Sequence, residues 1–414
     1  MPRIWPRLGR LFRSLLPGIF LFGFCIGTGS VTAMAKAGAD YGMALLWTVL
    51  LSCLLTYFLI TLYGRFTLVT GQTALLAFRR HIHPAVGMFF VVALTAHVSG
   101  SVIGVMGIIT DVCHEWSKTF VAGGVPRLAF AIFFIGAVYG LFLDGRMRVF
   151  EQTLAVIVAV MAVCFFINVF ITAPPLGEVL AGLRPAVPDT GPSESAFLVI
   201  ASMVGTTVFS GLFILRGSLV LEAGWTLADE GKQRRDAAFS ATLMFLASAA
   251  IMAAGAGTLY TRGIRLENVS EMITLLEPLA GRLASGIFVV GIVAAGVSSQ
   301  FPNVTLLPWM LNDYHQRERS VRRRDYRIMA LVISLLGLVV PITGAKPIAV
   351  MMVSQAFGAL VLPATVACLV YVGNRRDLMG RHAFGFGTNT LLVLALAFAV
   401  LMSVLSYRGL FALL

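Results

Sequence analysis

The stretches Gly27-Thr28-Gly29-Ser30 and Gly205-Thr206-Thr207 decide the fold, because each places small and hydroxylated residues inside a hydrophobic span. Each stretch lies in the first span of one half of the chain. Gly-rich segments often serve only to pack membrane helices closely. Two breaks at corresponding places, both rich in hydroxyl groups, instead indicate interrupted helices that hold a substrate near the bilayer centre. We expect the chain to be unwound at about 27–30 and 205–211, with the two breaks facing each other.

The composition is that of an integral membrane protein. Of the 414 residues, 58% are hydrophobic and 12% are charged, whereas soluble domains carry about 25% charged residues. Apolar stretches of about 20 residues, the length that crosses a bilayer, recur along the chain. The sequence therefore predicts an all-α integral membrane protein. Its eleven spans are expected at 15–39, 43–64, 86–110, 127–143, 148–172, 196–223, 237–258, 282–311, 328–344, 347–372 and 387–409.

The spans divide into two halves that begin alike. Residues 15–172 hold spans one to five and residues 196–372 hold spans six to ten, and each half opens with a broken span. Because five is an odd number, the second half is expected to be inverted relative to the first, an architecture found in many transporters. A cytoplasmic segment, 1–14, precedes the halves, an extracellular loop, 173–195, separates them, and residues 373–414 add a loop and an eleventh span.

Lysine and arginine are distributed unevenly between alternate loops. One set of loops collects 21 of the 31 basic residues, and the other set collects 8. Because basic loops remain in the cytoplasm, we expect the N-terminus inside and the C-terminus outside a prokaryotic inner membrane. The run Arg322-Arg323-Arg324 is interpreted as a lipid contact or topology signal rather than a nucleic-acid surface. The basic set comprises the N-terminal segment, 65–85, 144–148, 225–236, 312–327 and 373–386.

The expected spans carry no Asp or Glu near their centres, and Glu222 comes nearest. A site without a carboxylate suits a divalent metal poorly and an anion or a neutral solute better. The second half-helices, starting near Gly29 and Gly211, would present N–H groups and the positive end of the helix dipole to a ligand. The predicted substrate-binding residues are Gly27, Thr28, Gly29, Ser30, Gly205, Thr206, Thr207, Phe209, Ser210 and Gly211.

Two basic residues, Lys36 and Arg216, lie within the broken spans. Both are candidates for tuning the field of the site without touching the ligand. Lys36 is also placed to extend toward the outer surface, and Arg216 to pair with Glu222 or to cap carbonyls. Because an uncompensated charge at that depth costs several kcal/mol, Arg216 must have a partner or face water.

Several motifs resemble, in order, those of the Nramp metal-ion transporters. The first break is followed by Ala37-Gly38-Ala39-Asp40-Tyr41-Gly42 and Leu45-Leu46-Trp47, which look like the first helix of that family. The resemblance covers roughly residues 15–385. It implies the leucine-transporter fold, with ten core helices in two inverted repeats and an eleventh helix here. The further matches are Val69-Thr70-Gly71, Val102-Ile103-Gly104, Gly205-Thr206-Thr207-Val208, Ala294-Ala295-Gly296, Ser298-Ser299, Ser354-Gln355 and Leu362-Pro363.

The metal ligands of that family are replaced in this chain. The family's first break reads Asp-Pro-Gly-Asn, and its two metal-binding positions are here Gly27 and Ser30. The family's Met-Pro-His motif in the sixth span is here Phe209-Ser210-Gly211. Manganese and iron favour carboxylate, imidazole or thioether donors. The resemblance therefore implies a divergent branch that lacks the classical metal site, and Mn²⁺ is expected neither to bind tightly nor to be carried.

The proton route of the family is also replaced. Its acidic positions in the third span fall at Val98 and Ser101, and a second histidine of the sixth span corresponds to Arg216. The titratable residue nearest this route is His97, whose default interpretation is a hydrogen-bonded core histidine. We therefore expect the inherited proton route to be absent, with any role of His97 in proton movement left open.

Two substrate classes remain open. Transport of a small anion, of which bicarbonate has a suitable size and charge, is the leading hypothesis. The alternative is a divalent cation such as magnesium or manganese, held by carbonyl and hydroxyl oxygens. Ser298 and Ser299 are candidates for a sodium site, or serve packing, so the coupling ion stays open. Neither a catalytic constellation nor metal-like or redox-like cysteine spacing is present. The chain is expected to be no enzyme, to need no cofactor and to bind no nucleic acid.

Overall fold

The structure, a computed structural model, consists of helices and their connections in all the residues that it describes. These residues are 26–144, 162–171, 174–188, 196–276, 282–317 and 323–412. The helices are α3 (Thr28–Tyr41), α4 (Leu46–Thr70), α5 (Ala74–His81), α6 (Pro84–Ser117), α7 (Arg127–Asp144), α9 (Leu176–Ala181), α10 (Ala196–Thr207), α11 (Ser210–Glu222), α12 (Glu230–Thr258), α13 (Val269–Ile273), α15 (Arg282–His315), α16 (Arg324–Leu335), α17 (Val339–Thr343), α18 (Pro347–Asn374), α19 (Arg376–Met379) and α20 (Phe386–Phe411). A further apolar helix covers Ala162–Ile171.

The long helices coincide with the expected spans. Eight helical segments among the described residues are long and apolar enough to cross a membrane, and α7 is a shorter apolar helix. The expected span 196–223 is α10 together with α11, and 328–344 is α16 together with α17. Residues 15–25 of the first expected span, and 148–161 of the fifth, lie outside the described residues.

α12 starts earlier than expected, and its additional residues include a buried carboxylate. The span expected at 237–258 is α12, which begins at Glu230. Asp236 is therefore inside the helix, and its side chain is fully buried. The first part of this helix, 230–236, is rich in acidic and basic residues. The expected span was drawn from hydropathy and therefore began only after these charged residues. The expected span began at 237 and so left out Asp236, a buried carboxylate in the second turn of α12.

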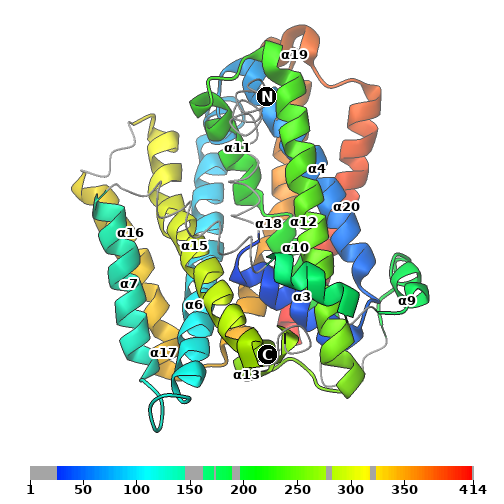
Figure 1. Cartoon of the computed structure of the whole chain (residues 1–414). Helices are drawn as coiled ribbons and strands as arrows, with labels where there is room; N and C mark the ends of the chain where they lie inside the picture. Colours follow the sequence, from blue (N-terminus) through cyan, green and yellow to red (C-terminus); the bar gives the residue numbers. More distant parts are fainter. Residues whose placement is uncertain are drawn as a thin grey trace, which may run out of the picture.

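The helices form three groups side by side (Figure 1). α7, α16 and α17 stand at one edge, and α4, α12 and α20 stand toward the other. Between these groups lie α6 and α15, and then the short helices α3, α10 and α11 with α18. α19 lies at one end of the molecule and α13 at the opposite end, and α9 lies at the side of the bundle.

Glycines allow the central helices to touch along their backbones. A Cβ atom on Gly38 of α3 would lie 2.0 Å from the carbonyl oxygen of Met252 in α12. A Cβ atom on Gly205 of α10 would lie 1.8 Å from the carbonyl oxygen of Gln355 in α18. Both distances are shorter than any real contact, so a side chain at either position would separate the helices. These glycines have the close-packing role of small residues in membrane helices.

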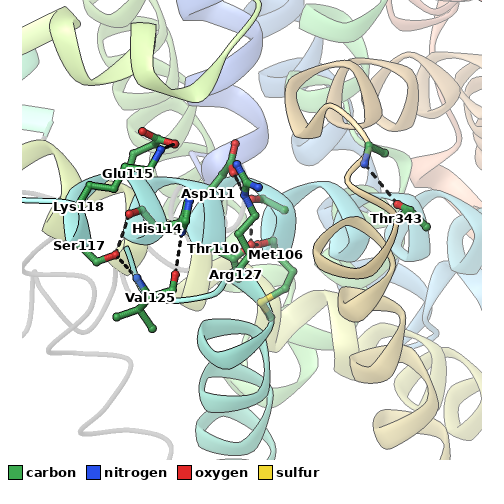
Figure 2. A network of polar contacts seen from close by, with 12 residues as sticks. Met106, Thr110, Asp111, His114, Glu115, Ser117, Lys118, Val125, Arg127 and Thr343 are labelled. Atoms are coloured by element: carbon green, nitrogen blue, oxygen red, sulfur yellow. Dashed lines mark hydrogen bonds and ion pairs between the residues drawn. The ribbon is translucent and has the colours of Figure 1, made fainter. Parts of the chain in front are cut away.

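Polar contacts fix one end of α6, which supplies one wall of the cavity described below (Figure 2). Arg127 at the start of α7 forms an ion pair with Asp111 of α6. The Nδ1 atom of His114 lies 2.8 Å from the carbonyl oxygen of Val125, and Ser117 Oγ accepts a hydrogen bond of 2.8 Å from the Val125 N–H. The turn between α6 and α7 is thereby bound to the last turns of α6.

The segment 259–276, which follows α12, is helical only over short stretches. α13 is five residues long, with a capping box formed by Asn268 and Glu271 at its start. Val269 and Met272 of α13, and Leu275 in the turn that follows it, are buried in the core. The segment therefore lies as a lid on the helical bundle, beside the end of α3.

Candidate ion site between the two helix breaks

At the first break, three of the four residues expected to be unwound are helical. α3 begins at Thr28, and Gly27 before it is extended, with φ −98° and ψ −171°. Thr28, Gly29 and Ser30 form the first helical turn rather than an unwound stretch. The carbonyl oxygen of Gly27 accepts a hydrogen bond from the Val31 N–H at 3.1 Å. What precedes Ile26 lies outside the described residues.

The second break is also shorter than the expected 205–211. α10 ends at Thr207 and α11 begins at Ser210, so only Val208 and Phe209 lie between them. The Val208 N–H still donates to the carbonyl oxygen of Val204 at 2.7 Å, and the Leu212 N–H donates to that of Phe209 at 3.0 Å. Hydrogen bonding therefore resumes almost at once, and the glycine and hydroxyl residues on both sides are helical.

Neighbouring helices satisfy the polar groups that this break exposes. Thr56 Oγ1 of α4 donates to the carbonyl oxygen of Thr207 at 2.9 Å. Ser210 Oγ lies 2.7 Å from Thr365 Oγ1 of α18, and Tyr63 of α4 donates to the Thr365 carbonyl at 2.8 Å. Irregular backbone at membrane depth is tolerated where it is buried in protein in this way. Thr207 and Ser210 thus support the break.

The two breaks meet at a small cavity. Ser30 Oγ of α3 and Thr206 Oγ1 of α10 lie 2.9 Å apart. The cavity beside them has a volume of about 40 Å³. Since a water needs about 10–15 Å³ of such volume, the space suits one small ion with little hydration. The described residues that line it are Gly27, Gly29, Ser30, His97, Ser101, Val105, Thr206, Phe209, Ser299, Asn303 and Gln355.

The predicted site residues fall into two groups. Gly27, Gly29, Ser30, Thr206, Phe209 and Ser299 line the cavity. Gly205 packs against α18, as described above, and Gly211 makes room for an aromatic ring. A Cβ atom on Gly211 would lie 2.4 Å from Phe209 Cζ, so the ring folds over the first turn of α11. The predicted residues that are not among those lining the cavity are Thr28, Gly205, Thr207, Ser210, Gly211 and Ser298.

Five lining residues were not among the predicted site residues. His97, Ser101 and Val105 are spaced by four residues on α6. Residues four apart share one face of a helix, so these three form a stripe toward the cavity. Ser299 and Asn303 of α15 repeat this spacing. A search for polar residues at helical spacing in the third and eighth spans would have found the stripes.

Two of these residues add amide groups. Asn303 Nδ2 donates to Ser101 Oγ at 3.2 Å, which ties α15 to α6 within the cavity wall. Gln355 Nε2 donates to Met351 Sδ at 3.3 Å. A Cβ atom on Gly29 would lie 2.6 Å from Gln355 Nε2, so the glycine allows the amide to approach α3. Each amide also has a carbonyl oxygen, which is a ligand for hard cations.

The two adjacent serines of α15, Ser298 and Ser299, differ in their position relative to the cavity. Ser299 lines the cavity, and its Oγ donates to the carbonyl oxygen of Ala295 at 2.6 Å. Ser298 is only half-buried and does not line the cavity. Pro302 lies inside α15. Because proline has no N–H, the carbonyl of Ser298 loses its helical donor. A sodium site at this pair remains a prediction.

Lys36 has a carboxylate partner instead of extending to the surface. Its Nζ lies 2.7 Å from Asp40 Oδ2, one turn along α3, and the lysine is only 8% exposed. Lys36 Nζ also donates to the carbonyl oxygen of Leu266 at 3.0 Å, and Asp40 Oδ1 accepts from the Leu266 N–H at 3.1 Å. The pair therefore holds both backbone groups of Leu266 and fixes the lid that contains α13.

Replacing Asp40 with alanine should loosen this lid. The Leu266 N–H loses its acceptor and Lys36 loses its charge partner, so local opening becomes easier. We expect hydrogen exchange at the Leu266 amide and over α13 to accelerate at least about tenfold, as measured by mass spectrometry. Lys346→Ala is the control, because Lys346 reaches the lid only through an exposed pair with Glu267, 3.5 Å away. Equal exchange rates in both variants would contradict the assignment.

The carboxylate beside Arg216 is Asp236 of α12. Arg216 Nη1 lies 2.7 Å from Asp236 Oδ2, and both side chains are 0% exposed. Arg216 Nη2 donates to the carbonyl oxygen of Gln233 at 3.3 Å, and the guanidinium lies 5.6 Å from the centre of the Trp225 ring. Of the two alternatives for Arg216, bonding to a carbonyl group is found at Gln233. The carboxylate partner is Asp236 rather than Glu222, because the expected span left Asp236 out. Each basic residue of the broken spans therefore has a carboxylate beside it.

The cavity lining is uncharged in the part of the chain that the structure describes. It offers hydroxyl groups, amides, one imidazole and one aromatic ring, and it contains neither a carboxylate nor a thioether. Within the described residues, no group of three or more His, Cys, Asp or Glu could hold a metal ion. The positive ends of α3 and α11 begin at this cavity. The site is therefore a neutral polar pocket at the junction of two interrupted helices.

Comparison with known proteins identifies the family. The family model described as "Natural resistance-associated macrophage protein-like", Nramp, matches residues 19–410. A divalent metal cation transporter MntH from Bradyrhizobium diazoefficiens is 25% identical over 92% of this chain and 85% of its own length. Another, from Mesorhizobium japonicum, is 23% identical over 99% of this chain and 90% of its own length. A third, from Clostridium acetobutylicum, is matched over 51% of its length.

Solved structures show the fold. A manganese transporter mutant from Eremococcus coleocola matches with a TM-score of 0.75 at 16% identity, covering 98% of this chain and 87% of that one. Mhp1, in its inward-facing form, matches with a TM-score of 0.61 at 16% identity, covering 96% and 88%. The predicted all-helical, leucine-transporter-like fold is thereby confirmed. With a family model that spans residues 19–410, the chain is a member of the Nramp family of membrane transporters and not an enzyme.

Proposed function

We propose that this transporter carries a divalent metal cation through the cavity between the two breaks, by alternating access. The main support for the proposal is that the cavity is lined by neutral oxygen and nitrogen donors, in a chain that belongs to the Nramp family. Ser30, Thr206 and Ser299 supply hydroxyl oxygens, Asn303 and Gln355 supply amide groups, and His97 supplies an imidazole. Oxygen and imidazole donors bind divalent cations without carrying a charge themselves.

This proposal replaces the anion as the leading substrate. The hydroxyl and N–H donors at the breaks favour an anion, but polar residues of α6, α15 and α18 also line the cavity. The lining residues of these helices include two with an amide oxygen and one with an imidazole, which are groups that bind cations. The relatives that match over most of their length are named as divalent metal cation transporters. A neutral site holds a divalent ion less tightly than a carboxylate site, so we expect weak binding.

A small anion such as bicarbonate is the second candidate, and one specific observation favours it. No described residue of the cavity lining is acidic, and both α3 and α11 begin at the cavity. Helix N-termini with serine and threonine hydroxyl groups attract anions. A divalent cation must overcome these positive helix ends, whereas an anion benefits from them.

Uptake into proteoliposomes separates the two candidates. Initial rates should be measured for Mn²⁺, Mg²⁺ and bicarbonate in the same vesicles, with empty liposomes as background. We expect saturable cation uptake that Ser30→Ala reduces about tenfold, since the loss of one good ligand costs about 1.4 kcal/mol. Ser334→Ala is the matched control, because Ser334 Oγ donates within α16, away from the cavity. Bicarbonate uptake without cation uptake would reject the proposal and support the anion.

A further inference from the structure

His97 occupies an unusual position for a buried histidine. It is only 4% exposed, yet its side chain lines the ion cavity. Its ring stacks on Phe209, with 4.8 Å between the ring centres and 27° between the planes. On α18, a Cβ atom at Gly358 would lie 2.7 Å from His97 Cε1 and 3.0 Å from His97 Nδ1. The absence of a side chain at Gly358 therefore leaves the room that the ring occupies.

The protein leaves part of this ring unsatisfied. His97 Nδ1 is fully enclosed beside Gly358 and has no hydrogen-bond partner among the described residues, whereas Nε2 is not enclosed and is the ring nitrogen that is free to reach the cavity. The backbone carbonyl of His97, in contrast, accepts a hydrogen bond from Ser354 Oγ at 3.1 Å, which fixes α6 against α18. A buried polar atom without a partner costs about 1–3 kcal/mol. A histidine kept for packing alone would be replaced by phenylalanine without this cost.

The ring also differs chemically from the rest of the cavity lining. The other polar lining groups are hydroxyl groups and amides, whose oxygen atoms suit Mg²⁺ and Ca²⁺. Neutral imidazole instead binds first-row transition metals, with an affinity that rises from Mn²⁺ toward Cu²⁺. Mg²⁺ prefers oxygen ligands and parts with its hydration shell reluctantly. A nitrogen donor in an otherwise oxygen-rich pocket therefore discriminates between the two classes of cation.

We propose that His97 selects the substrate, by binding a first-row transition-metal ion directly through its imidazole nitrogen and so favouring it over Mg²⁺. The inference rests on the proposed function, since it assigns the class of cation that the same cavity carries. Phe209 and Gly358 act as positioning residues, because they confine the ring to the cavity wall from two sides.

The test compares Co²⁺ with Mg²⁺ in wild type and in two variants. His97→Phe keeps the ring volume and the stack on Phe209 but removes the nitrogen donors, and His97→Gln restores a polar group without an imidazole. We expect wild type to carry Co²⁺ in preference to Mg²⁺, and both variants to lose at least about tenfold of this preference, because loss of the imidazole lowers Co²⁺ uptake far more than Mg²⁺ uptake. Calorimetric titration with Co²⁺ should show the same loss in affinity.

His114→Phe is the matched control. His114 lies on the same helix, about 26 Å further along at 1.5 Å per residue, and its Nδ1 atom contacts the carbonyl oxygen of Val125 rather than the cavity. We expect this variant to keep the Co²⁺ preference. Size-exclusion profiles and melting temperatures in detergent show whether each variant is folded, and the ratio of the two uptake rates does not depend on how much protein is active.

Two results would overturn the inference in different ways. If His97→Phe carries Co²⁺ and Mg²⁺ in the same ratio as wild type, the cavity still carries cations, but His97 does not select them. If wild type carries neither cation and transports bicarbonate, the proposed function fails and the selection of a metal fails with it. A nitrogen signal in the electron spin echo of bound Mn²⁺ that disappears in His97→Phe would establish direct coordination.

Discussion

Asp236→Ala should lower the melting temperature of the detergent-solubilised protein by about 5–10 °C. The substitution leaves the guanidinium of Arg216 buried without its carboxylate, and removing one partner of a buried ion pair costs about 3–5 kcal/mol. Both side chains are 0% exposed, so water cannot compensate for the loss. The melting temperature is measured by fluorescence-detected size-exclusion chromatography after heating.

Two further variants make this prediction specific. The double variant Arg216→Met, Asp236→Leu removes both charges together and should regain most of the lost stability, because apolar residues of similar volume often replace a buried pair at little cost. Lys232→Ala breaks the exposed pair with Asp229, in which the lysine is 57% exposed, and should change the melting temperature very little. A double variant that is as unstable as Asp236→Ala would contradict the importance of the pair.

Gly205→Ala should abolish most transport, with a reduction of at least tenfold in the initial uptake rate. The added Cβ atom would lie 1.8 Å from the carbonyl oxygen of Gln355, and backbone cannot yield as a side chain can. α10 and α18 must therefore separate, which moves Thr206 and Gln355 away from their places in the cavity wall, and misplacing site residues by 1 Å can cost about a hundredfold in rate.

Gly136→Ala provides the control for this substitution. A Cβ atom at Gly136 in α7 would meet no heavy atom within 4 Å, so alanine should leave both uptake and melting temperature unchanged. Normal uptake by Gly205→Ala, with normal expression, would contradict this prediction. It would show that α10 and α18 can accommodate a methyl group at this contact and that Gly205 is not needed for their packing.

The fold was largely predictable, because hydropathy locates the membrane spans and the glycine-rich stretches locate the two helix breaks. Spans such as α4 and α20 are continuous apolar runs, and the order of the motifs around the two broken spans was enough to indicate the family. Helix ends were less predictable. The start of α12 at Glu230 is charged, and only its packing against α4 and α11 buries Gln233 and Asp236.

The site was predictable in part, for a physical reason. Glycine and hydroxyl residues such as Ser30 and Thr206 signal a break within one helix, so a linear pattern reveals them. The opposite wall comes from intact helices, where His97 and Asn303 resemble ordinary core residues. Their positions depend on how α6 and α15 pack, which no local pattern specifies.

The interpretation of the basic residues changes with their partners. Lys36 and Arg216 were candidates for raising the positive potential of the site, and each has a carboxylate 2.7 Å away. A close pair of opposite charges has little net field at a distance. Replacing Arg216 alone would therefore report on the folding of α11 against α12, and it is a poor test of the sign of the substrate charge.

The placement of the contacts along α12 has a mechanical consequence. α12 has 29 residues, about 43 Å at 1.5 Å per residue. At its start, Asp236 binds Arg216 of α11, and near its end the backbone of Met252 touches Gly38 of α3. α12 thus contacts α11 near one of its ends and α3 near the other, and both of these half-helices border the cavity. We therefore expect a movement of either half-helix to displace α12, and through α12 the other half-helix as well.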